Sequence, residues 1–535
     1  MPGRTNCNGN SCRRLLPVLG ITVVAAAARA WLLFDTPYMP GVNGAYYLVQ
    51  ARSLLERGAL GIPDMPLVFY LHAALAWGIA GISGMAQADA IVWSVKLCDA
   101  VLPPLVAWPV FGLVRQWAAV RGRGDAVPLA AAALACFAWP WFRMVGELQK
   151  NSLALVWFAA LALLLHRWLG APTPRRGAAV LGCLLLLGLT HVGVLGAAVV
   201  LLASTTLVFT SVKGVAGWRQ VLPGMGAAGL LVVLVGTLVL WKFDPARIHR
   251  LITAFTNPAA FSAEGKQMPV PPGGGMDVLR WLPALAFAVA VVPGLCVVWR
   301  RRKGQPAADV ALVAGAALTV LALTGPWWST DKAVRFDLIA FVPAVMVLAF
   351  ALLHLTSGWL RGGIVGAVLV GAIGSATPML ERGGSAILSR AAMMELQSLA
   401  THVQRPERAL ICASHGVEWW TAWWLHTRIA QASALKADDW QRYDAVLFLE
   451  IKSGLQAPPG PGGGRPPGPG RAETSGPGQR LPKALPPPAS MGAAPSMSAP
   501  VPPGAEMLHD GPCITLVRIG VPLAGGGVVS RPIGS

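Results

Sequence analysis

The chain has 535 residues, of which 55% are apolar and 13% are charged. Because a water-soluble domain carries about 25% charged residues, this composition excludes a soluble enzyme. The formal net charge is +19, but basic residues cluster at the ends of apolar runs, as at Arg175, Arg176 and residues 300–303. This placement favours membrane lipid headgroups as partners and argues against nucleic acid.

Apolar runs dominate the first 380 residues, and many are long enough to cross a hydrocarbon layer of about 30 Å. We therefore predict an all-α polytopic membrane domain over residues 1–380, with about 11 to 13 transmembrane helices. The basic stretch 115–123 leaves the topology of the early spans open. The candidate spans are 15–34, 66–84, 89–114, 127–145, 152–168, 177–190, 192–211, 221–241, 281–299, 307–326, 336–356 and 363–379.

The predicted loop 35–65 between the first two spans contains a short amphipathic segment. We expect a helix from Ala45 to Arg57, with Asn43 placed to cap its start and Gly58 to end it. Its apolar positions alternate with polar and charged ones, which is typical of a helix lying along a membrane surface.

Composition changes after residue 380, where a strand, helix, strand order predicts a small soluble α/β domain over 381–453. Residues 454–504 are rich in proline and glycine, so we predict a disordered linker there. The strand-like segment Cys513–Ile519 lies in the C-terminal part 505–535 and could add to the small sheet. The predicted fold class is therefore an all-α membrane protein with a C-terminal α/β appendage.

A carboxylate stands at each end of the first loop, Asp35 after the first span and Asp64 before the second. Such groups at a membrane surface could deprotonate an acceptor hydroxyl or hold a metal. The simpler alternatives are that Asp35 solvates a helix end and that Asp64 belongs to the proline-flanked turn 62–66.

The segment 45–77, AYYLVQARSLLERG followed by the proline-led PDMPLVFYLHAALAW, resembles the start of the GT-C fold integral membrane glycosyltransferases. That group includes protein O-mannosyltransferases and aminoarabinose transferases and uses polyprenyl-phosphate sugars. The matching residues are Tyr46, Tyr47, Ala51, Gly58, Pro66, Leu67, Phe69 and Tyr70. The family's acidic pair is replaced here by Val42, Asn43 and Gly44, and an amide is not a base at neutral pH.

The resemblance implies roles for particular side chains. Asp35 or Asp64 would be the catalytic base or a metal ligand, and Asn43, Tyr46 and Tyr47 would bind substrate. The segment 331–347 resembles a late segment of the same group, so Arg335, with Lys332, would face the lipid phosphate. Interfacial anchoring is the alternative for both cations. No cofactor is assigned, and a divalent metal stays open.

The polar segment 146–155, GELQKNSLAL, interrupts two apolar runs. Its residues Glu147 and Lys150 could line a headgroup or sugar pocket. They could equally form a hydrated loop in which the two side chains pair at i and i+3.

The segment 413–430 is rich in tryptophan and contains His415 and Glu418 three residues apart. That spacing is a weak signal for a metal pair because it lacks a third ligand. The tryptophans form an aromatic face that could lie at headgroup level or stack on a sugar, or could dock the appendage.

We therefore predict a multi-pass membrane glycosyltransferase, in a bacterial cytoplasmic membrane, that transfers a sugar from a polyprenyl-phosphate donor to an extracytoplasmic acceptor. A lipid or solute transporter is one alternative, since a dozen spans with broken helices would also suit a carrier. A non-catalytic scaffold derived from the transferase fold is another.

Overall fold

A computed structural model describes residues 10–245, 248, 252, 288, 291–300, 304–325, 328, 330–382, 384–430, 435, 439–452, 505–519, 521–522 and 528–529. The chain forms two compact units. The membrane unit comprises Met1–Asp35 and Gln50–Gly383, and the α/β unit comprises Thr36–Val49 and Gly384–Ser535. The predicted linker 454–504 lies outside the described residues.

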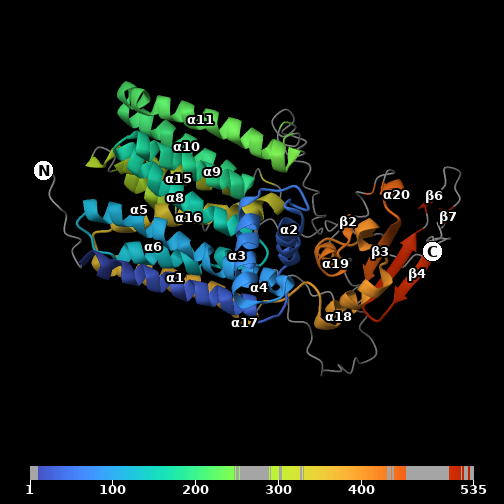
Figure 1. Cartoon of the computed structure of the whole chain (residues 1–535). Helices are drawn as coiled ribbons and strands as arrows, with labels where there is room; N and C mark the ends of the chain where they lie inside the picture. The colour runs from blue at the N-terminus through green and yellow to red at the C-terminus, as the bar shows by residue number, and fades with distance from the viewer. Residues whose placement is uncertain are drawn as a thin grey trace, which may run out of the picture. The chain divides into compact units, whose positions relative to one another are not determined.

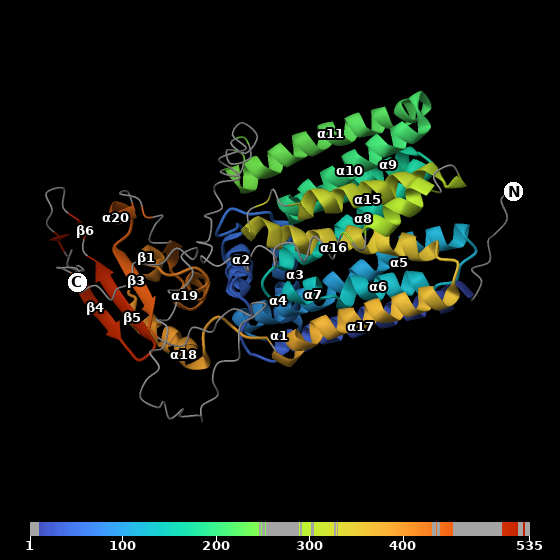
Figure 2. The same cartoon turned by 180° about the vertical axis from the view of Figure 1, so that it is seen from behind.

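The membrane unit is a bundle of helices that lie side by side (Figures 1 and 2). Its interior is mainly apolar, and the largest fully buried side chains include Trp117, Trp141, Phe158 and Phe350. The helices are α1 (Asn10–Phe34), α3 (Leu67–Ser83), α4 (Gln87–Val101), α5 (Ala107–Val120), α6 (Ala126–Phe137), α7 (Trp139–Arg143), α8 (Gln149–Gly170), α9 (Pro174–Thr190), α10 (Val192–Lys213), α11 (Val215–Phe243), α15 (Ala307–Thr324), α16 (Thr330–Leu353) and α17 (Gly358–Arg382).

Eight segments among the described residues are long and apolar enough to cross a membrane. Two shorter apolar helices, Leu67–Ser83 and Val291–Arg300, accompany them. The prediction of a multi-pass helical membrane protein is confirmed. The eight segments are Leu15–Phe34, Gln87–Val120, Ala126–Arg143, Gln149–Gly170, Val192–Lys213, Ala307–Thr324, Ala333–Leu353 and Gly358–Pro378.

One of the predicted spans is interrupted, and two adjacent predicted spans are separated by a single residue. The span predicted over 89–114 bends at the 3-10 turn Pro103–Val106 between α4 and α5, because prolines lack the N–H that an α-helix needs. The spans predicted over 177–190 and 192–211 are the separate helices α9 and α10, and between them the Nδ1 atom of His191 accepts a hydrogen bond from the Val194 N–H at 3.2 Å. His191 is thus the N-cap of α10.

A buried polar network joins α5, α8, α15 and α16. The Oδ2 atom of Asp309 accepts a hydrogen bond from the Nη2 atom of Arg121 at 3.2 Å, and its Oδ1 atom lies 2.7 Å from the Nε2 atom of His166. The Nε atom of Arg121 also donates to His354 at 3.1 Å, and its guanidinium lies 4.7 Å from the centroid of the Phe350 ring. Asp309 of α15 therefore contacts the C-terminal end of α5 and α8, and Arg121 extends the network to α16.

The helix predicted from Ala45 to Arg57 is α2 (Gly44–Arg57). It ends at Gly58, which has φ 68° and donates its N–H to the Leu54 carbonyl at 3.0 Å. This left-handed conformation favours glycine and stops the helix. The first residues of α2 belong to the α/β unit, and its residues from Gln50 onward belong to the membrane unit.

The α/β unit is built on a five-stranded sheet of order β2-β1-β3-β5-β4. Strand β1 is parallel to β2 and β3, and β5 is antiparallel to β3 and β4. The predicted C-terminal α/β appendage is confirmed. The strands are β1 (Ala409–Cys412), β2 (Arg428–Ala430), β3 (Ala445–Ile451), β4 (Ala505–Asp510) and β5 (Ile514–Ile519), with a separate pair β6 (Val521–Pro522) and β7 (Val528–Val529); the helices are α18 (Arg390–Ser398), α19 (Val417–Leu425) and α20 (Asp439–Arg442), with 3-10 turns at Leu399–His402 and Pro406–Arg408.

Helix α18 is tied to the β4–β5 hairpin by one carboxylate. Glu395 lies 3.0 Å from the Nε2 atom of His509 and accepts the backbone N–H groups of Cys513 and Ile514, both at 2.9 Å. Burial raises the pKa of Glu395, but these three hydrogen bonds to its charged form outweigh burial and lower the pKa below its ordinary value.

Candidate functional site

A buried ion pair joins two residues of the membrane unit that are 86 positions apart in sequence, Asp64 and Lys150. Asp64 stands just before α3 and is 4% exposed. Its Oδ1 atom accepts the N–H of Met65 at 2.8 Å, and its Oδ2 atom pairs with the Lys150 ammonium. The ammonium also lies 5.6 Å from the centroid of the Phe69 ring. Lys150 lies in the first turn of α8, where a positive charge interacts unfavourably with the helix dipole. The Asp64 carboxylate offsets this unfavourable interaction.

The loop that carries Asp64 is held by a buried glutamine of α2. Gln50 donates from Nε2 to the Ile62 carbonyl at 2.7 Å and accepts the N–H groups of Gly61 and Ile62 at 2.9 and 3.1 Å. The sequence pattern alone did not mark Gln50 as a site residue. The available signal was its position four residues after Tyr46, which places both side chains on one face of the helix.

A second buried ion pair, between α1 and α4, holds the turn that precedes α8. The Nη2 atom of Arg29 in α1 lies 2.6 Å from the Oδ1 atom of Asp99 in α4, and both side chains are fully buried. The Oδ2 atom of Asp99 accepts the N–H of Gly146 at 2.7 Å. Gly146 has φ 74°, a conformation that favours glycine. This pair therefore positions the turn that leads into Glu147 and Lys150.

Sequence analysis also missed Arg29 and Asp99. Each is a charged residue inside an apolar run, which is the signal that marks a paired or functional group within a membrane.

The polar segment 146–155 begins as a turn and continues as the start of α8. Glu147 pairs with Arg143 at 2.7 Å, and Lys150 pairs with Asp64. These ion pairs therefore join Lys150 to a carboxylate distant in sequence and Glu147 to an arginine four residues earlier, whereas the hydrated-loop alternative expected Glu147 to pair with Lys150.

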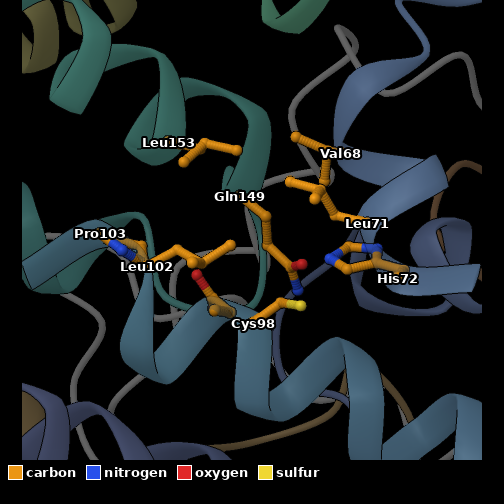
Figure 3. A pocket seen from close by; sticks show the side chains of 9 residues that line it. Val68, Leu71, His72, Cys98, Leu102, Pro103, Gln149 and Leu153 are labelled. Atoms are coloured by element: carbon orange, nitrogen blue, oxygen red, sulfur yellow. The ribbon is translucent and has the colours of Figure 1, made fainter. Parts of the chain in front are cut away.

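A small cavity lies between α3, α4, the turn at Pro103 and α8 (Figure 3). Gln149 is 3% exposed, and its side chain points toward His72 and Cys98. Neither its Oε1 nor its Nε2 atom has a hydrogen-bond partner within the described part of the chain. An unpaired buried amide costs about 1 to 3 kcal/mol, so it marks a place for a water molecule or a polar ligand atom. The cavity is lined by Val68, Leu71, His72, Cys98, Asp99, Leu102, Pro103, Gln149 and Leu153.

Two further predicted site residues are exposed. Asp35 follows the last turn of α1, and its carboxylate makes no hydrogen bond or ion pair with any described residue. Arg335 is exposed in the first turns of α16, and the side chain of Lys332 lies outside the described residues. Of the two candidate catalytic carboxylates, Asp64 is buried beside the Lys150 ammonium, whereas Asp35 is exposed.

Asn43, Tyr46 and Tyr47 belong to the α/β unit. The Asn43 carbonyl accepts the N–H of Tyr46 at 3.1 Å at the start of α2. The ring centroids of Tyr46 and Tyr47 are 5.6 Å apart, and that of Tyr46 is 4.8 Å from that of Trp419.

No group of three or more His, Cys, Asp or Glu side chains that could hold a metal occurs among the described residues. The Nδ1 atom of His415 and the Oε1 atom of Glu418 lie 2.9 Å apart, as their spacing predicts, but no third potential metal ligand joins them among the described residues. Asp64 faces an ammonium group, and a cation beside a carboxylate disfavours a second cation. These residues do not fit a divalent metal at the Asp64 site.

No family model matches the chain, and a comparison with curated proteins finds no match. Among solved structures the chain is similar to ArnT from Cupriavidus metallidurans, whose crystal structure was determined bound to undecaprenyl phosphate. The two sequences are 12% identical, the similarity covers 94% of this chain and 97% of that one, and the TM-score is 0.49. Similarity at this level assigns neither a substrate nor a reaction to this chain.

Proposed function

We propose that the chain is a membrane glycosyltransferase that transfers a sugar from a polyprenyl-phosphate donor to an extracytoplasmic acceptor. The observation that carries the proposal is the buried Asp64–Lys150 pair. It combines a carboxylate just before α3 and a cation in the first turn of α8, and Asp64 lies within the segment 45–77 whose sequence resembles the GT-C glycosyltransferases. A multi-pass membrane unit is also the setting that a lipid-linked donor requires.

The pair supplies the two groups that the reaction needs. The acceptor hydroxyl oxygen forms a bond to the anomeric carbon, and the bond from that carbon to the phosphate oxygen breaks. Asp64 takes the hydroxyl proton, and polyprenyl phosphate leaves with the bonding electrons. Lys150 stabilises the negative charge that develops on the leaving phosphate, most effectively in a water-poor site.

The resting ion pair also gives a reason for substrate-dependent activation. While Lys150 holds the Asp64 carboxylate, that carboxylate is a poor base. A phosphate group arriving beside Lys150 competes for the ammonium and releases Asp64 for the acceptor. In this scheme Gln149 offers an amide to a sugar hydroxyl, and Glu147 orients Arg143 as a further cation.

The other residues predicted from the sequence would take part in substrate binding. Tyr46, Tyr47 and Asn43 would shape the acceptor entrance, and Arg335 with Lys332 would contact the lipid phosphate on its approach. The membrane would be a bacterial cytoplasmic membrane, with residues 454–504 as a linker within the C-terminal part.

The test is turnover by the purified full chain reconstituted in liposomes with radiolabelled polyprenyl-phosphate sugars. We expect release of free polyprenyl phosphate, and a loss of about 100-fold or more in Asp64→Asn, the scale of a general base. Asp89→Asn is the matched control, because Asp89 is an exposed carboxylate in the first turn of α4. If Asp35→Asn abolishes turnover and Asp64→Asn retains it, the role given to Asp64 is wrong.

Two other outcomes would overturn the proposal as a whole. Counterflow of the labelled lipid in sealed vesicles without sugar release would identify a transporter. Saturable binding of the lipid without turnover by any tested donor would identify a non-catalytic scaffold.

A further inference from the structure

An apolar groove lies between three neighbouring helices of the membrane unit, α6, α16 and α17 (Figure 2). Its walls come from residues 127–134 of α6, 345–352 of α16 and 365–369 of α17, and every side chain that lines it is an alanine, a valine or a leucine. The wall on α6 extends for about 10 Å along the helix axis. The groove is therefore long enough to hold part of one lipid chain.

Helix α17 is the least covered of the three helices. In Gly358–Pro378, 11% of the apolar window is buried, whereas 83% of the window in Ala333–Leu353 is buried. Large apolar side chains such as Val370 and Ile373 are exposed on α17, at 72% and 56%. Because protein covers so little of α17, lipid chains must supply most of its apolar contacts in a bilayer.

Two arginines converge on one carbonyl at the end of this groove. Arg123 donates from Nη2 to the Leu355 carbonyl at 3.4 Å, and Arg361 donates from Nη1 to the same oxygen at 3.5 Å. Arg123 precedes the groove residue Val127 by four positions, and Arg361 precedes Val365 by four. Two guanidinium groups therefore lie at the mouth of the groove.

The charge at this mouth is not compensated by the protein. Neither of its two guanidinium groups pairs with a carboxylate within the part of the chain that the structure describes, and their bonds to the carbonyl are long. Nearby cations do have counter-ions, since Arg115 lies 3.6 Å from Asp125 and Arg121 lies 3.2 Å from Asp309. The mouth thus carries two positive charges and favours an anion.

An exposed tryptophan indicates the level of this mouth in a membrane. Trp359 stands in the first turn of α17, two residues before Arg361, and is 94% exposed. Tryptophan side chains at the ends of membrane helices lie at the level of the lipid headgroups. The two guanidinium groups are therefore at headgroup level, and the groove extends from them into the hydrocarbon layer.

The mouth is also far from the Asp64–Lys150 pair, at the other end of the bundle (Figures 1 and 2). Lys150 lies in the first turn of α8, and His166 lies about 24 Å further along that helix. The buried network of Asp309 joins the His166 end of α8 to the end of α16, where Leu355 lies. A donor phosphate beside Lys150 is therefore not the anion that faces this mouth.

We propose that the groove between α6, α16 and α17 is a binding site for an anionic glycerophospholipid of the surrounding bilayer. One acyl chain lies in the groove, and the phosphate accepts hydrogen bonds from Arg123 and Arg361, whose guanidinium groups match phosphate geometry. The two uncompensated charges favour a lipid with a net negative charge over a zwitterionic one. The bound lipid fastens α17 to the bundle, whether or not the reaction proposed at Asp64 takes place.

Native mass spectrometry of the purified full chain in detergent, titrated with phosphatidylglycerol, tests the site. We expect one phosphatidylglycerol to bind more tightly than phosphatidylcholine with the same acyl chains. Combining Arg123→Gln with Arg361→Gln should weaken phosphatidylglycerol binding about 30-fold, at about fivefold for each arginine. The single variants give the same answer if the double variant does not fold.

The matched control combines Arg175→Gln with Arg219→Gln. It removes the same charge from exposed arginines in the first turns of α9 and α11, so the affinity for phosphatidylglycerol should stay within about twofold of the wild type. Ala130→Phe tests the apolar part of the site, because Ala130 lines the groove and both arginines remain. We expect Ala130→Phe to weaken binding although the net charge is unchanged.

Three results would overturn the site. An equal loss in the Arg175/Arg219 control would mean that phosphatidylglycerol responds to net charge alone. Full affinity in Ala130→Phe would mean that the headgroup adsorbs at the arginines without a chain in the groove. Displacement of phosphatidylglycerol by a lower concentration of polyprenyl phosphate, dependent on Arg123 and Arg361, would mean that the groove holds the lipid carrier rather than a lipid of the bilayer.

Discussion

Single residues decide the chemistry of the site, because buried charges require partners. Lys150 is the clearest case, since its ammonium is largely buried and meets one carboxylate, Asp64, and one aromatic ring, Phe69. Removing one partner of such a pair leaves an uncompensated charge, which costs about 3 to 5 kcal/mol.

Lys150→Ala should therefore lower the stability of the membrane unit markedly. The double variant Asp64→Asn with Lys150→Met should recover much of the loss, because neither charge remains. Thermal unfolding in detergent measures both. Arg408→Ala is the control: Arg408 and Asp444 pair at 2.7 Å but are 58% and 40% exposed, and such pairs contribute about 1 kcal/mol or less. A double variant less stable than Lys150→Ala would contradict this account.

At the scale of elements, one carboxylate in each unit fixes how neighbouring helices and strands are arranged, because apolar packing alone has little directional preference. In the membrane unit this is the Asp309 network of α5, α8, α15 and α16. It also bears on the basic stretch 115–123, which left the topology open. Arg121 pairs with Asp309, and Arg115 lies 3.6 Å from Asp125. Two of the positive charges in this stretch are therefore compensated by carboxylates.

Asp309→Ala should destabilise the bundle by several kcal/mol, because Arg121 is left buried without its carboxylate. Asp125→Ala is the matched control, since it breaks a pair whose side chains are each 33% exposed. The midpoint of thermal unfolding of the two variants is the measurement. Equal midpoints would mean that the network adds no more than a surface pair.

In the α/β unit the corresponding contact is Glu395, which holds the β4–β5 hairpin to α18. Its folded-state pKa is lowered from the ordinary 4.5, so its contribution is complete above that value and is lost as pH falls through the folded-state pKa. Glu395→Gln should therefore lower the unfolding temperature of the unit at pH 7 and weaken its decline below about pH 4.5. Circular dichroism of the full chain between pH 3 and 7 checks this. An unchanged pH dependence in Glu395→Gln would refute it.

At the scale of the whole molecule, patterns that repeat along the chain were predictable from sequence. Apolar runs of membrane length gave the multi-pass bundle, since hydrocarbon forces backbone groups to pair within each segment. The start of α2 near Asn43 and its end at Gly58 followed from local capping and glycine preferences. The break of the 89–114 span at Pro103 was missed, although proline lacks the donor that an α-helix needs.

The candidate site was predictable only in part. Asp64 and Lys150 were each singled out, but nothing in the sequence joined them, because their pairing depends on where α8 starts relative to α3. Arg29, Asp99 and Gln50 were passed over, although two of them are charged residues within apolar runs.

The sequence by itself determined that this chain crosses a membrane many times and carries a small α/β part, because hydrophobic length and strand–helix order are local properties. Only the tertiary structure decided which carboxylate is buried beside a cation, which buried glutamine has no hydrogen-bond partner among the described residues, and that residues 36–49 pack against α19 and residues 385–387 of the α/β unit. Those facts depend on contacts between segments far apart in the chain, and charge pairing across such distances has no local signature.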